Sequence, residues 1–407
     1  MNEGGTAIIR PLDYNNPRGF LFSDEPRHYC DREVLRIREI TAFFKKEAVL
    51  CIAVILAVIS MFFVPPDGKY IDYIDFRTLS ILFCLMAVMS GLREIGVFDR
   101  LSAALVKKCN SLPGITIILN LLCFFLSMVI TNDVALLTFV PFALVILKMI
   151  NVKKGYTAIL IIMLTISANM GSMLTPLGNP QNLYLYGRAG LSFAEFIKIM
   201  LPYTALALLV LMGWIMIYCR KGGKISVSLP DTKPVSTTKL AIYSLLFIVS
   251  LLAVLRIYSY LIPLIAVIIL MAVFDYKNYL RIDYSLLLTF VAFFVFIGNM
   301  GRLPVFKDFL EEIVNNHVIA TGIISSQVIS NVPAALLLSG FTESYRNLLV
   351  AVNLGGLGTL IASMASLISY KIYVKENIGS KGRYLLFFSI ANICFLIILI
   401  ALNIIIS

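Results

Sequence analysis

The sequence predicts an all-α, polytopic membrane protein with two inverted repeats, each containing a re-entrant helical hairpin and a broken transmembrane helix. Three observations predict this fold class: long apolar stretches, a biased distribution of lysine and arginine, and a polar pattern that recurs in the second half. Of the 407 residues, 59% are hydrophobic and 14% are charged, whereas a soluble domain carries about 25% charged residues. The chain therefore has too few charged residues to form the surface of a water-soluble protein.

Several apolar stretches approach the roughly 20 helical residues that cross the hydrocarbon of a bilayer. The clearest are 50–64, 79–89, 203–218, 240–255, 261–274, 286–297 and 385–406. Mostly polar residues precede the first of them, so we expect a cytoplasmic N-terminal arm (1–46) and a first transmembrane helix (47–76) without a secretory signal. The seven cysteines include no CxxC pair, so neither a disulfide framework nor a cysteine metal site is expected.

Lysine and arginine collect in cytoplasmic loops, so their distribution tests a topology. With the N-terminus inside and the C-terminus outside, 26 of the 34 basic residues fall in predicted inside segments. Those segments are 1–46, 93–111, 148–155, 220–239, 275–282 and 371–383. Because the basic residues lie between spans, the net charge of +11 indicates membrane topology and not nucleic-acid binding.

The apolar stretch 114–150 has lysines on both flanks, so both of its ends are expected in the cytoplasm. Its middle holds Thr131, Asn132 and Asp133. Each arm has only about 16–18 residues, so a hairpin that dips into the membrane is favoured over two full crossings. Non-helical backbone at membrane depth is tolerated where it is buried in protein or lines an aqueous cavity.

The second half contains a counterpart of each element in the same order. A second hairpin, 318–342, has Ser-Asn-Val-Pro at its tip, and broken helices at 156–187 and 345–372 share Asn, Gly and Thr at the same relative positions. The predicted organisation is 77–219 for repeat 1, 220–283 for a cytoplasmic linker and scaffold helices, and 284–407 for repeat 2. Five crossings lie between the start of the first repeat and the start of the second, and this odd number inverts the second repeat. Inverted repeats with interrupted helices in corresponding positions point to a transporter's midplane site.

These motifs resemble those of the ion transporter superfamily, which includes arsenite permeases, citrate–metal transporters and divalent-anion/sodium symporters. The residues that carry the resemblance are Thr131-Asn132-Asp133-Val134-Ala135 with Pro141, Gly178-Asn179-Pro180-Gln181-Asn182, and Ser330-Asn331-Val332-Pro333. The resemblance implies an elevator-type transporter, usually a homodimer, with a substrate site where the hairpin tips meet the unwound helices. The dicarboxylate symporters have Ser-Asn-Thr at both tips, whereas the Asn-Asp pair here is closer to the arsenite-permease pattern.

The predicted substrate site combines hydroxyls and amides from both halves. Its candidates are Thr131, Asn132, Asn179, Gln181, Asn182, Ser330, Asn331, Thr359 and Ser363. The ion-coupling candidates are Asp133, Thr131, Thr175, Gly178 and Asn353. A charged group at the bilayer centre costs about 2.5–3.5 kcal/mol and commonly marks an ion or proton pathway. The plainer alternatives are that Asp133 caps the second hairpin arm and that Gly355 and Gly356 only allow close packing. Tyr184 and Tyr186 are expected to be interfacial anchors rather than ligands.

We therefore expect a secondary-active transporter that moves a small organic carboxylate or oxyanion across the cytoplasmic membrane, coupled to Na⁺ or H⁺. Efflux of arsenite or antimonite and Na⁺/H⁺ antiport stay open as alternatives. An intramembrane enzyme is disfavoured because neither histidine lies in a confident span, and ATP-driven transport is disfavoured because the sequence has no GxxxxGK[ST] motif. No cofactor is expected beyond the coupling ion.

Overall fold

The computed structural model describes residues 47–219, 234–377 and 379–406. The chain divides into two compact units, residues 1–48 and 49–407, and nearly all described residues belong to the second. The predicted N-terminal arm and residues 220–233 of the predicted linker lie outside the described residues.

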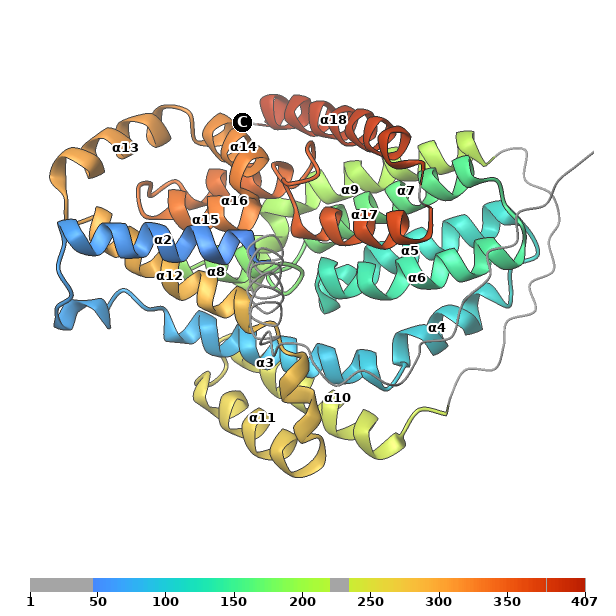
Figure 1. The fold of residues 1–407 in the computed structure, drawn as a ribbon, viewed down its shortest axis with the longest axis horizontal. Coiled ribbons are helices and arrows are strands. Elements are labelled where there is room, and N and C mark those ends of the chain that lie inside the picture. Colours follow the sequence, from blue (N-terminus) through green and yellow to red (C-terminus); the bar gives the residue numbers. More distant parts are fainter. Residues whose placement is uncertain (1–46, 220–233, 378, 407) are drawn as a thin grey trace, which may run out of the picture. The chain divides into compact units, whose positions relative to one another are not determined.

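The described residues form 17 α-helices and two 3₁₀ helices (Figure 1). The first half contains α2 (Ala48–Phe63), η1 (Gly68–Tyr70), α3 (Phe76–Glu94), α4 (Val97–Val106), α5 (Leu112–Ile130), α6 (Asn132–Met149), α7 (Lys154–Ser172), α8 (Pro180–Arg188) and α9 (Phe193–Tyr218). The second half contains α10 (Thr237–Val254), α11 (Leu261–Phe274), η2 (Tyr276–Arg281), α12 (Tyr284–Met300), α13 (Pro304–Asn316), α14 (Val318–Ile329), α15 (Asn331–Ser339), α16 (Tyr345–Leu354), α17 (Met364–Glu376) and α18 (Lys381–Ile406).

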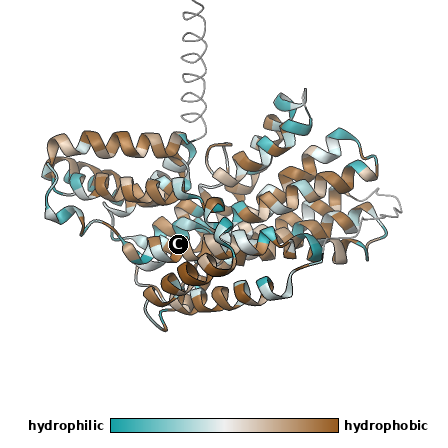
Figure 2. Cartoon of the chain, turned by 60° about the horizontal axis from the view of Figure 1, so that its bottom comes forward, coloured by the Kyte–Doolittle hydropathy of each residue, from teal (hydrophilic) through white to brown (hydrophobic). Residues whose placement is uncertain are grey.

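Seven of these helices are long and apolar enough to cross a membrane, namely α3, α5, α6, α7, α9, α10 and α18. Helices α12 and α13 meet at 109° and qualify only when taken together. Figure 2 shows that the helices are apolar along most of their length, with polar residues gathered at their ends and connections. The chain is therefore a multi-pass, all-helical membrane protein, as the apolar stretches predicted.

Helices α3 and α12 begin in the same way, although they lie in different halves of the chain. Asp75 precedes α3 and accepts a hydrogen bond from the backbone N–H of Thr78 at 2.9 Å. Asp283 precedes α12 and accepts one from the N–H of Leu286 at 3.1 Å. The backbone angles of the two aspartates agree closely, with φ/ψ of −80°/82° and −79°/84°. Each carboxylate pairs an N–H that the first turn leaves unsatisfied.

The two helical hairpins, α5–α6 and α14–α15, each turn at one residue with an unusual backbone conformation. Thr131 has φ/ψ of 67°/150° and Ser330 has 75°/154°. A positive φ is strained for a residue with a Cβ atom and persists only where surrounding contacts enforce it. The next residue supplies such a contact in both hairpins: Asn132 N–H donates to Gly178 O at 3.1 Å, and Asn331 N–H donates to Ala362 O at 3.0 Å.

The arms of the two hairpins differ in length. Helices α5 and α6 have 19 and 18 residues, and both are long enough to cross a membrane, whereas α14 and α15 have 12 and 9. At a rise of 1.5 Å per residue, the first pair extends roughly 28 Å and the second pair roughly 14–18 Å. The predicted boundaries of both hairpins fall within a few residues of the observed helices, and their depth in the membrane stays a prediction.

Two helices are broken next to the hairpins, between α7 and α8 and between α16 and α17. Matching residues of the two breaks are separated by 184 positions: Asn169 and Asn353, Gly171 and Gly355, Thr175 and Thr359, Asn179 and Ser363. Their contacts also match, because Thr175 Oγ1 donates to Met128 O and Thr359 Oγ1 donates to Gln327 O. In both halves a threonine of the break thus binds the last turn of the first hairpin arm.

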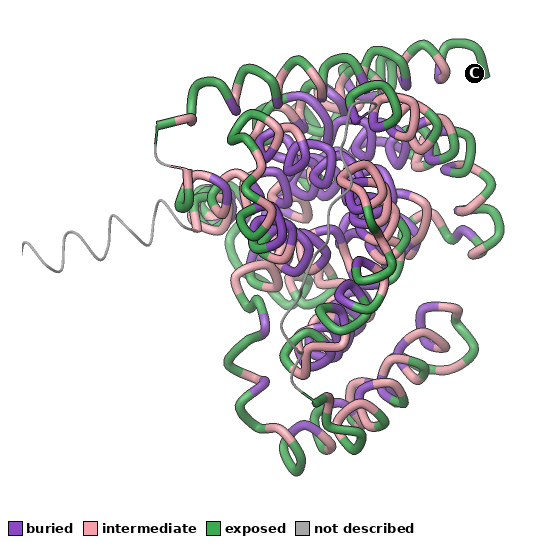
Figure 3. Tube along the Cα trace, turned by 90° about the vertical axis from the view of Figure 1, so that its right-hand side faces the viewer, coloured by how far each residue is buried: buried purple, intermediate pink, exposed green. Residues whose placement is uncertain are grey.

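Figure 3 shows buried residues gathered in the interior of the helix packing, with the C-terminal helix α18 at its edge. In the apolar stretch of α7, 83% of the residues are buried, against 22% for α18. A Cβ atom on Gly171 of α7 would lie 2.0 Å from Phe124 O, and one on Gly355 would lie 2.6 Å from Ser326 Oγ. Both glycines are therefore required for close helix contact, as the packing alternative for Gly355 proposed.

Ion pairs between distant segments join residues that the lysine and arginine pattern predicts on one side of the membrane. Lys148 pairs with Glu376 at 2.8 Å, and both lie in predicted inside segments. Arg302 pairs with Asp67 at 2.8 Å, and both lie in predicted outside segments. Such exposed pairs add only about 0–1 kcal/mol of stability, but they show which chain segments are neighbours.

Candidate functional site

The two hairpin tips meet at the second helix break. Asn132 Nδ2, at the first tip, donates to Asn169 Oδ1 at 3.1 Å, and Ser363 Oγ donates to the same oxygen at 3.1 Å. Asn331, at the second tip, binds the carbonyl of Ala362 through its backbone N–H. Residues far apart in the sequence, and predicted to converge, therefore lie around one buried polar centre.

Two further hydrogen bonds connect the halves in a reciprocal way. Asn169 Nδ2 on α7 donates to Ser366 Oγ on α17 at 3.2 Å. Asn353 Nδ2 on α16 donates to Asn182 Oδ1 on α8 at 2.7 Å. All four side chains are buried, and removing one partner of a buried pair leaves the other with an uncompensated desolvation cost. The helix before the break in each half thus donates a hydrogen bond to the helix after the break in the other half: α7 to α17, and α16 to α8.

We expect Asn169→Leu to lower the thermal unfolding midpoint and to abolish transport. The substitution leaves the partners Asn132 and Ser363 without their shared acceptor, which costs about 1–3 kcal/mol for each unpaired group. Asn392→Leu is the matched control, because the amide of Asn392 is also buried but donates only to Phe388 O of its own helix. Unfolding of both variants would be followed by intrinsic fluorescence, and equal midpoints would contradict the role of Asn169 in joining the halves.

A cavity of about 190 Å³ lies against the first tip and the first break. Its polar lining includes Thr131, Asp133 and Asn179, and its apolar walls come from α3, α12 and α17. At one end it is lined by Arg93, Arg281 and Asp283, three exposed residues. This end belongs to segments predicted on the inside, so the cavity extends from the polar centre toward the predicted cytoplasmic side.

The carboxylate of Asp133 does not cap the hairpin arm, in contrast to the plainer alternative. Helix α6 has Thr131 at its N-cap position and no capping hydrogen bond from a side chain of the described chain. Asp133 Oδ1 is buried and has no hydrogen-bond partner among the described residues. Asn179 Oδ1 and both polar atoms of Gln181 are in the same situation. Because buried polar atoms are normally paired, these oxygens suit a bound cation, a proton or a polar ligand.

The other predicted site residues divide into two groups. Ser363, Asn182 and Asn353 belong to the hydrogen-bond network that joins the halves. Thr175 and Thr359 instead brace the breaks. The hydroxyl of Thr175 accepts a bond from Gly178 N–H at 3.2 Å as well as donating to Met128 O, and its oxygen is thus already engaged.

Thr359 is exposed and is held by Gln327. Its backbone N–H donates to Gln327 Oε1 at 2.8 Å, and it does not line the cavity. Ser330 is buried at the second tip, where its hydroxyl lies 3.4 Å from Ala362 O. Thr359 is therefore placed to support the second break, and Ser330 is placed at the meeting point of the halves.

Several residues of the site were not predicted from the sequence. Asn169 receives two hydrogen bonds and donates a third, and its match to Asn353 was the signal that could have identified it. Arg93 and Arg281 were counted only as basic residues of predicted inside segments, and Asp283 was not singled out. The expectation for Tyr184 and Tyr186 was wrong: both are buried against protein, and the hydroxyl of Tyr184 lies 2.8 Å from Ser339 Oγ.

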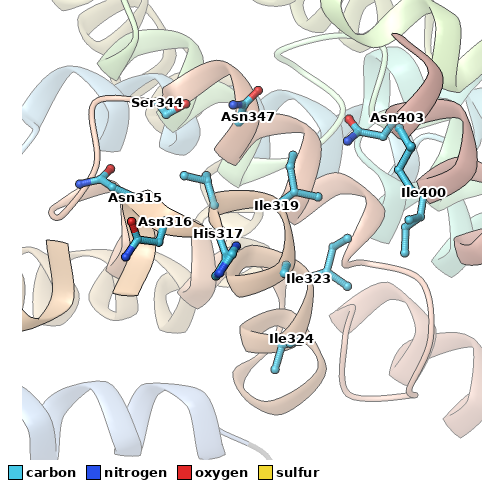
Figure 4. A pocket seen from close by; sticks show the side chains of 13 residues that line it. Asn315, Asn316, His317, Ile319, Ile323, Ile324, Ser344, Asn347, Ile400 and Asn403 are labelled. Carbon is cyan, nitrogen blue, oxygen red and sulfur yellow. The ribbon is translucent and has the colours of Figure 1, made fainter. Parts of the chain in front are cut away.

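A larger pocket, of about 600 Å³, lies elsewhere, among α13, α14, α16 and α18 (Figure 4). It is lined by side chains such as His317, Asn347 and Ile400, with none of the predicted site residues. Its size therefore does not make it the better candidate, since the convergent polar groups lie around the smaller cavity.

Hairpins and broken helices that meet around a buried polar centre, within a multi-pass helical protein, define a membrane transporter. The chain belongs to the citrate transporter family, whose pattern matches residues 39–345. It is 35% identical to an uncharacterized transporter of Methanocaldococcus jannaschii over 81% of this chain and 89% of that protein. It is 33% identical to the inner membrane protein YbiR of Escherichia coli over 76% of this chain and 84% of that protein. A putative transporter of Dictyostelium discoideum, arsB, is 26% identical over 36% of this chain and 26% of that protein.

Proposed function

We propose that this protein is a secondary-active transporter that moves a small organic carboxylate or oxyanion across the cytoplasmic membrane, coupled to Na⁺ or H⁺. The observation that carries the proposal is the convergence of both hairpin tips on the second helix break. The first tip reaches Ser363 through Asn169, the second tip binds Ala362, and the adjacent cavity contains Asp133, whose Oδ1 is unpartnered among the described residues. An intramembrane carboxylate of this kind commonly belongs to an ion or proton pathway.

The two halves are proposed to be inverted repeats. The matched capping aspartates, the matched positive-φ tips and the constant interval between the helix breaks support this relation. With the N-terminus inside, the first hairpin enters from the cytoplasm and the second from the opposite side. The pair of hairpins then encloses one site near the middle of the bilayer.

The two halves differ in a way that assigns them different tasks. Asp133 at the first tip corresponds to Val332 at the second, and Gln181 corresponds to Ala365. Among the described residues of the site, the unpartnered polar atoms therefore gather in the first half. We assign ion coupling to this half, with Asp133 and the amide oxygen of Asn179 as the nearest oxygen ligands.

The substrate is proposed to bind where both re-started helices begin. Helix α8 starts after Asn179 and α17 starts after Ser363, so free backbone N–H groups and the positive ends of two helix dipoles point toward the centre. Asn132 and Asn331 add amide groups from the tips. Arg93 adds positive charge at the mouth of the cavity, whereas the charge of Arg281 is paired with Glu94 at 2.8 Å. This set of groups favours an anion with several oxygens.

The transport movement is proposed to be of the elevator type in a homodimer. The hairpins and broken helices would move as a core against a scaffold that includes α3, α10, α11 and α12. The cavity reaches residues of the predicted cytoplasmic side, so we assign this conformation to the inward-facing state.

The test is uptake of radiolabelled citrate, succinate, sulfate and arsenite into proteoliposomes with imposed Na⁺ or pH gradients. We expect saturable, gradient-driven uptake of one anion class and a matching rise of the thermal midpoint in detergent. Liposomes with the Asn169→Leu variant are the control. Flux that neither saturates nor responds to an ion gradient would contradict a coupled carrier.

Arsenite or antimonite efflux is the second candidate, favoured by the Asn132-Asp133 pair at the first tip. Arsenite is largely an uncharged hydroxide at neutral pH, so its binding needs amide and hydroxyl groups more than positive charge. Everted membrane vesicles, in which efflux appears as accumulation, separate this candidate from anion uptake.

A further inference from the structure

A second polar pocket lies on the side of α8 that faces the predicted outside. It has a volume of about 250 Å³ and is called the arginine pocket here. It is lined by Asp75, Arg77, Thr78, Ile81, Leu183, Tyr186, Gly187, Arg188 and Val254. Leu183 also lines the site cavity described above, so a single apolar side chain borders both spaces.

A third arginine, Arg256, does not line the pocket itself but contacts Tyr186, one of the lining residues. Its Nη2 donates to Tyr186 O at 3.0 Å, and its guanidinium lies over the Tyr186 ring, 5.0 Å from the centroid. Its backbone N–H and the side chain of Arg77 donate to the same carbonyl oxygen, that of Ala253, at 3.1 and 3.4 Å. Arg77 and Arg256 thus share one acceptor, in the residue before Val254 of the pocket lining.

The pocket carries an excess of positive charge, because two arginines and one carboxylate line it. Within residues 47–219, 234–377 and 379–406, Arg77, Arg188 and Arg256 form no ion pair with a carboxylate. The acidic lining residue, Asp75, accepts hydrogen bonds from the N–H and hydroxyl of Thr78 at 2.9 and 2.5 Å. Unpaired guanidinium groups that share a concave site attract and concentrate anions.

The backbone of Arg256 is an independent sign that its side chain matters. Arg256 follows the end of α10 with φ of 62°, in the left-handed region that glycine usually occupies after a helix. Its N–H donates to Ala253 O, and the next N–H, of Ile257, donates to Leu252 O. A strained arginine is thus retained at a position where glycine would fit without strain, and its side chain contacts Tyr186 of the pocket lining.

The arginine pocket lies at the start of α3 in the first half, and the mouth of the site cavity lies at the corresponding position in the second half, the start of α12. Asp75 begins α3 at the arginine pocket, and its counterpart Asp283 begins α12 at the mouth of the site cavity. Helix α8 lines the former and its counterpart α17 lines the latter. In a pair of inverted repeats, the equivalent of an inner mouth is an outer mouth.

We propose that the arginine pocket is the outer vestibule of the transport pathway and binds a small anion with several oxygens, such as a carboxylate or sulfate, through its guanidinium groups. In this conformation Leu183 and Ile81 separate the vestibule from the central site. The assignment as a vestibule rests on the proposed transport function, whereas anion binding in the pocket does not. Concentration of anions at the outer mouth favours uptake over efflux.

The test uses the full chain with Gly187→Cys, purified in detergent. A Cβ atom at position 187 would have only Thr78 Oγ1 within 4 Å, at 3.6 Å, so the thiol fits in the pocket. The thiol is labelled with an anionic or a cationic methanethiosulfonate, and peptide mass spectrometry separates this position from the seven native cysteines. The measured quantity is the ratio of the anionic to the cationic labelling rate. We expect this ratio to be about tenfold higher at position 187 than at an exposed reference thiol, and we expect added salt to lower it.

Three further measurements connect the rate to the arginines. Sulfate or citrate at constant ionic strength should slow labelling by the anionic reagent. Adding Arg77→Gln and Arg188→Gln, which change the two arginines that line the pocket, should remove the charge preference. Arg346→Gln is the matched control, because Arg346 is an exposed arginine of the same predicted side that does not line the pocket.

Equal relative rates for the two reagents, or a preference unchanged by loss of the arginines, would overturn the proposal. Failure of both reagents to react would also overturn it, because a vestibule must be open to water. The proteoliposome assay is independent of these results. A charge preference without any anion uptake would support the anion-binding pocket and refute the transport function. Uptake without a charge preference would support the transport function and refute the anion-binding pocket.

Discussion

Asp133→Asn is expected to abolish accumulation of substrate above its external concentration in proteoliposomes. The amide keeps the shape of the side chain but can neither carry the charge that balances Na⁺ nor exchange a proton. Asp133 Oδ1 is buried and unpartnered among the described residues, so the fold does not depend on its hydrogen bonds. Removing a charge that costs about 2.5–3.5 kcal/mol in the membrane should leave the thermal midpoint equal or raise it.

The control for this variant is Asp99→Asn, in the amphipathic helix α4. Asp99 is exposed and does not line the site cavity, so its variant should retain gradient-driven uptake. Uptake is measured under a Na⁺ gradient and under a pH gradient, and the gradient whose effect disappears in Asp133→Asn identifies the coupling ion. If Asp133→Asn keeps the same ion dependence as the unchanged protein, Asp133 is not the coupling group.

Gly171→Ala is expected to be strongly destabilising, because it adds a methyl group at a close contact between two core helices. The new Cβ atom would lie 2.0 Å from Phe124 O and 2.6 Å from Ser127 Oγ. Because a helix carbonyl cannot turn aside without losing its own hydrogen bond, α5 and α7 would have to separate. Overpacking commonly costs about 1–3 kcal/mol, and contact with rigid backbone places this change at about 3 kcal/mol or more.

Gly213→Ala provides the comparison, since Gly213 also lies inside a long helix but has no neighbouring atom within 4 Å of the point where the added methyl group would lie. Alanine favours helix by about 1 kcal/mol over glycine, so this variant should unfold at the same temperature or slightly higher. Midpoints are measured in the same detergent by fluorescence-detected unfolding. A Gly171→Ala midpoint that matches the Gly213→Ala midpoint within the error of the measurement would show that α5 and α7 do not pack this closely.

Many of the apolar helices and the turns of the hairpins could be predicted because they depend on composition and local order. The stretches 50–64, 261–274 and 286–297 are exceptions, since their helices are too short to cross a membrane by themselves. Apolar length and basic flanks locate α5, α6 and their turn, since both reflect the cost of polar groups in lipid. The hydrogen-bond partners inside the site could not be predicted, because an amide pairs with any donor or acceptor that the fold brings near it. Asn169 and Ser366 are 197 residues apart, and nothing local relates them.

Thr175, Tyr184 and Tyr186 also show that the local sequence does not determine the partners of a polar side chain. A threonine in a polar break can bind a ligand or the backbone, and Thr175 binds Met128 O. A tyrosine that follows an apolar stretch can lie at the lipid headgroups or pack inside, and Tyr184 and Tyr186 pack inside. In each case the local sequence is the same for both outcomes, and only the tertiary neighbours decide between them.

The reciprocal ties between Asn353 and Asn182 and between Asn169 and Ser366 limit how this molecule can cycle. Each tie spans the two sequence halves, so neither half can slide along its neighbour without breaking a buried amide contact. The helices on both sides of the two breaks are therefore expected to move together as one rigid body in any conformational change of this region.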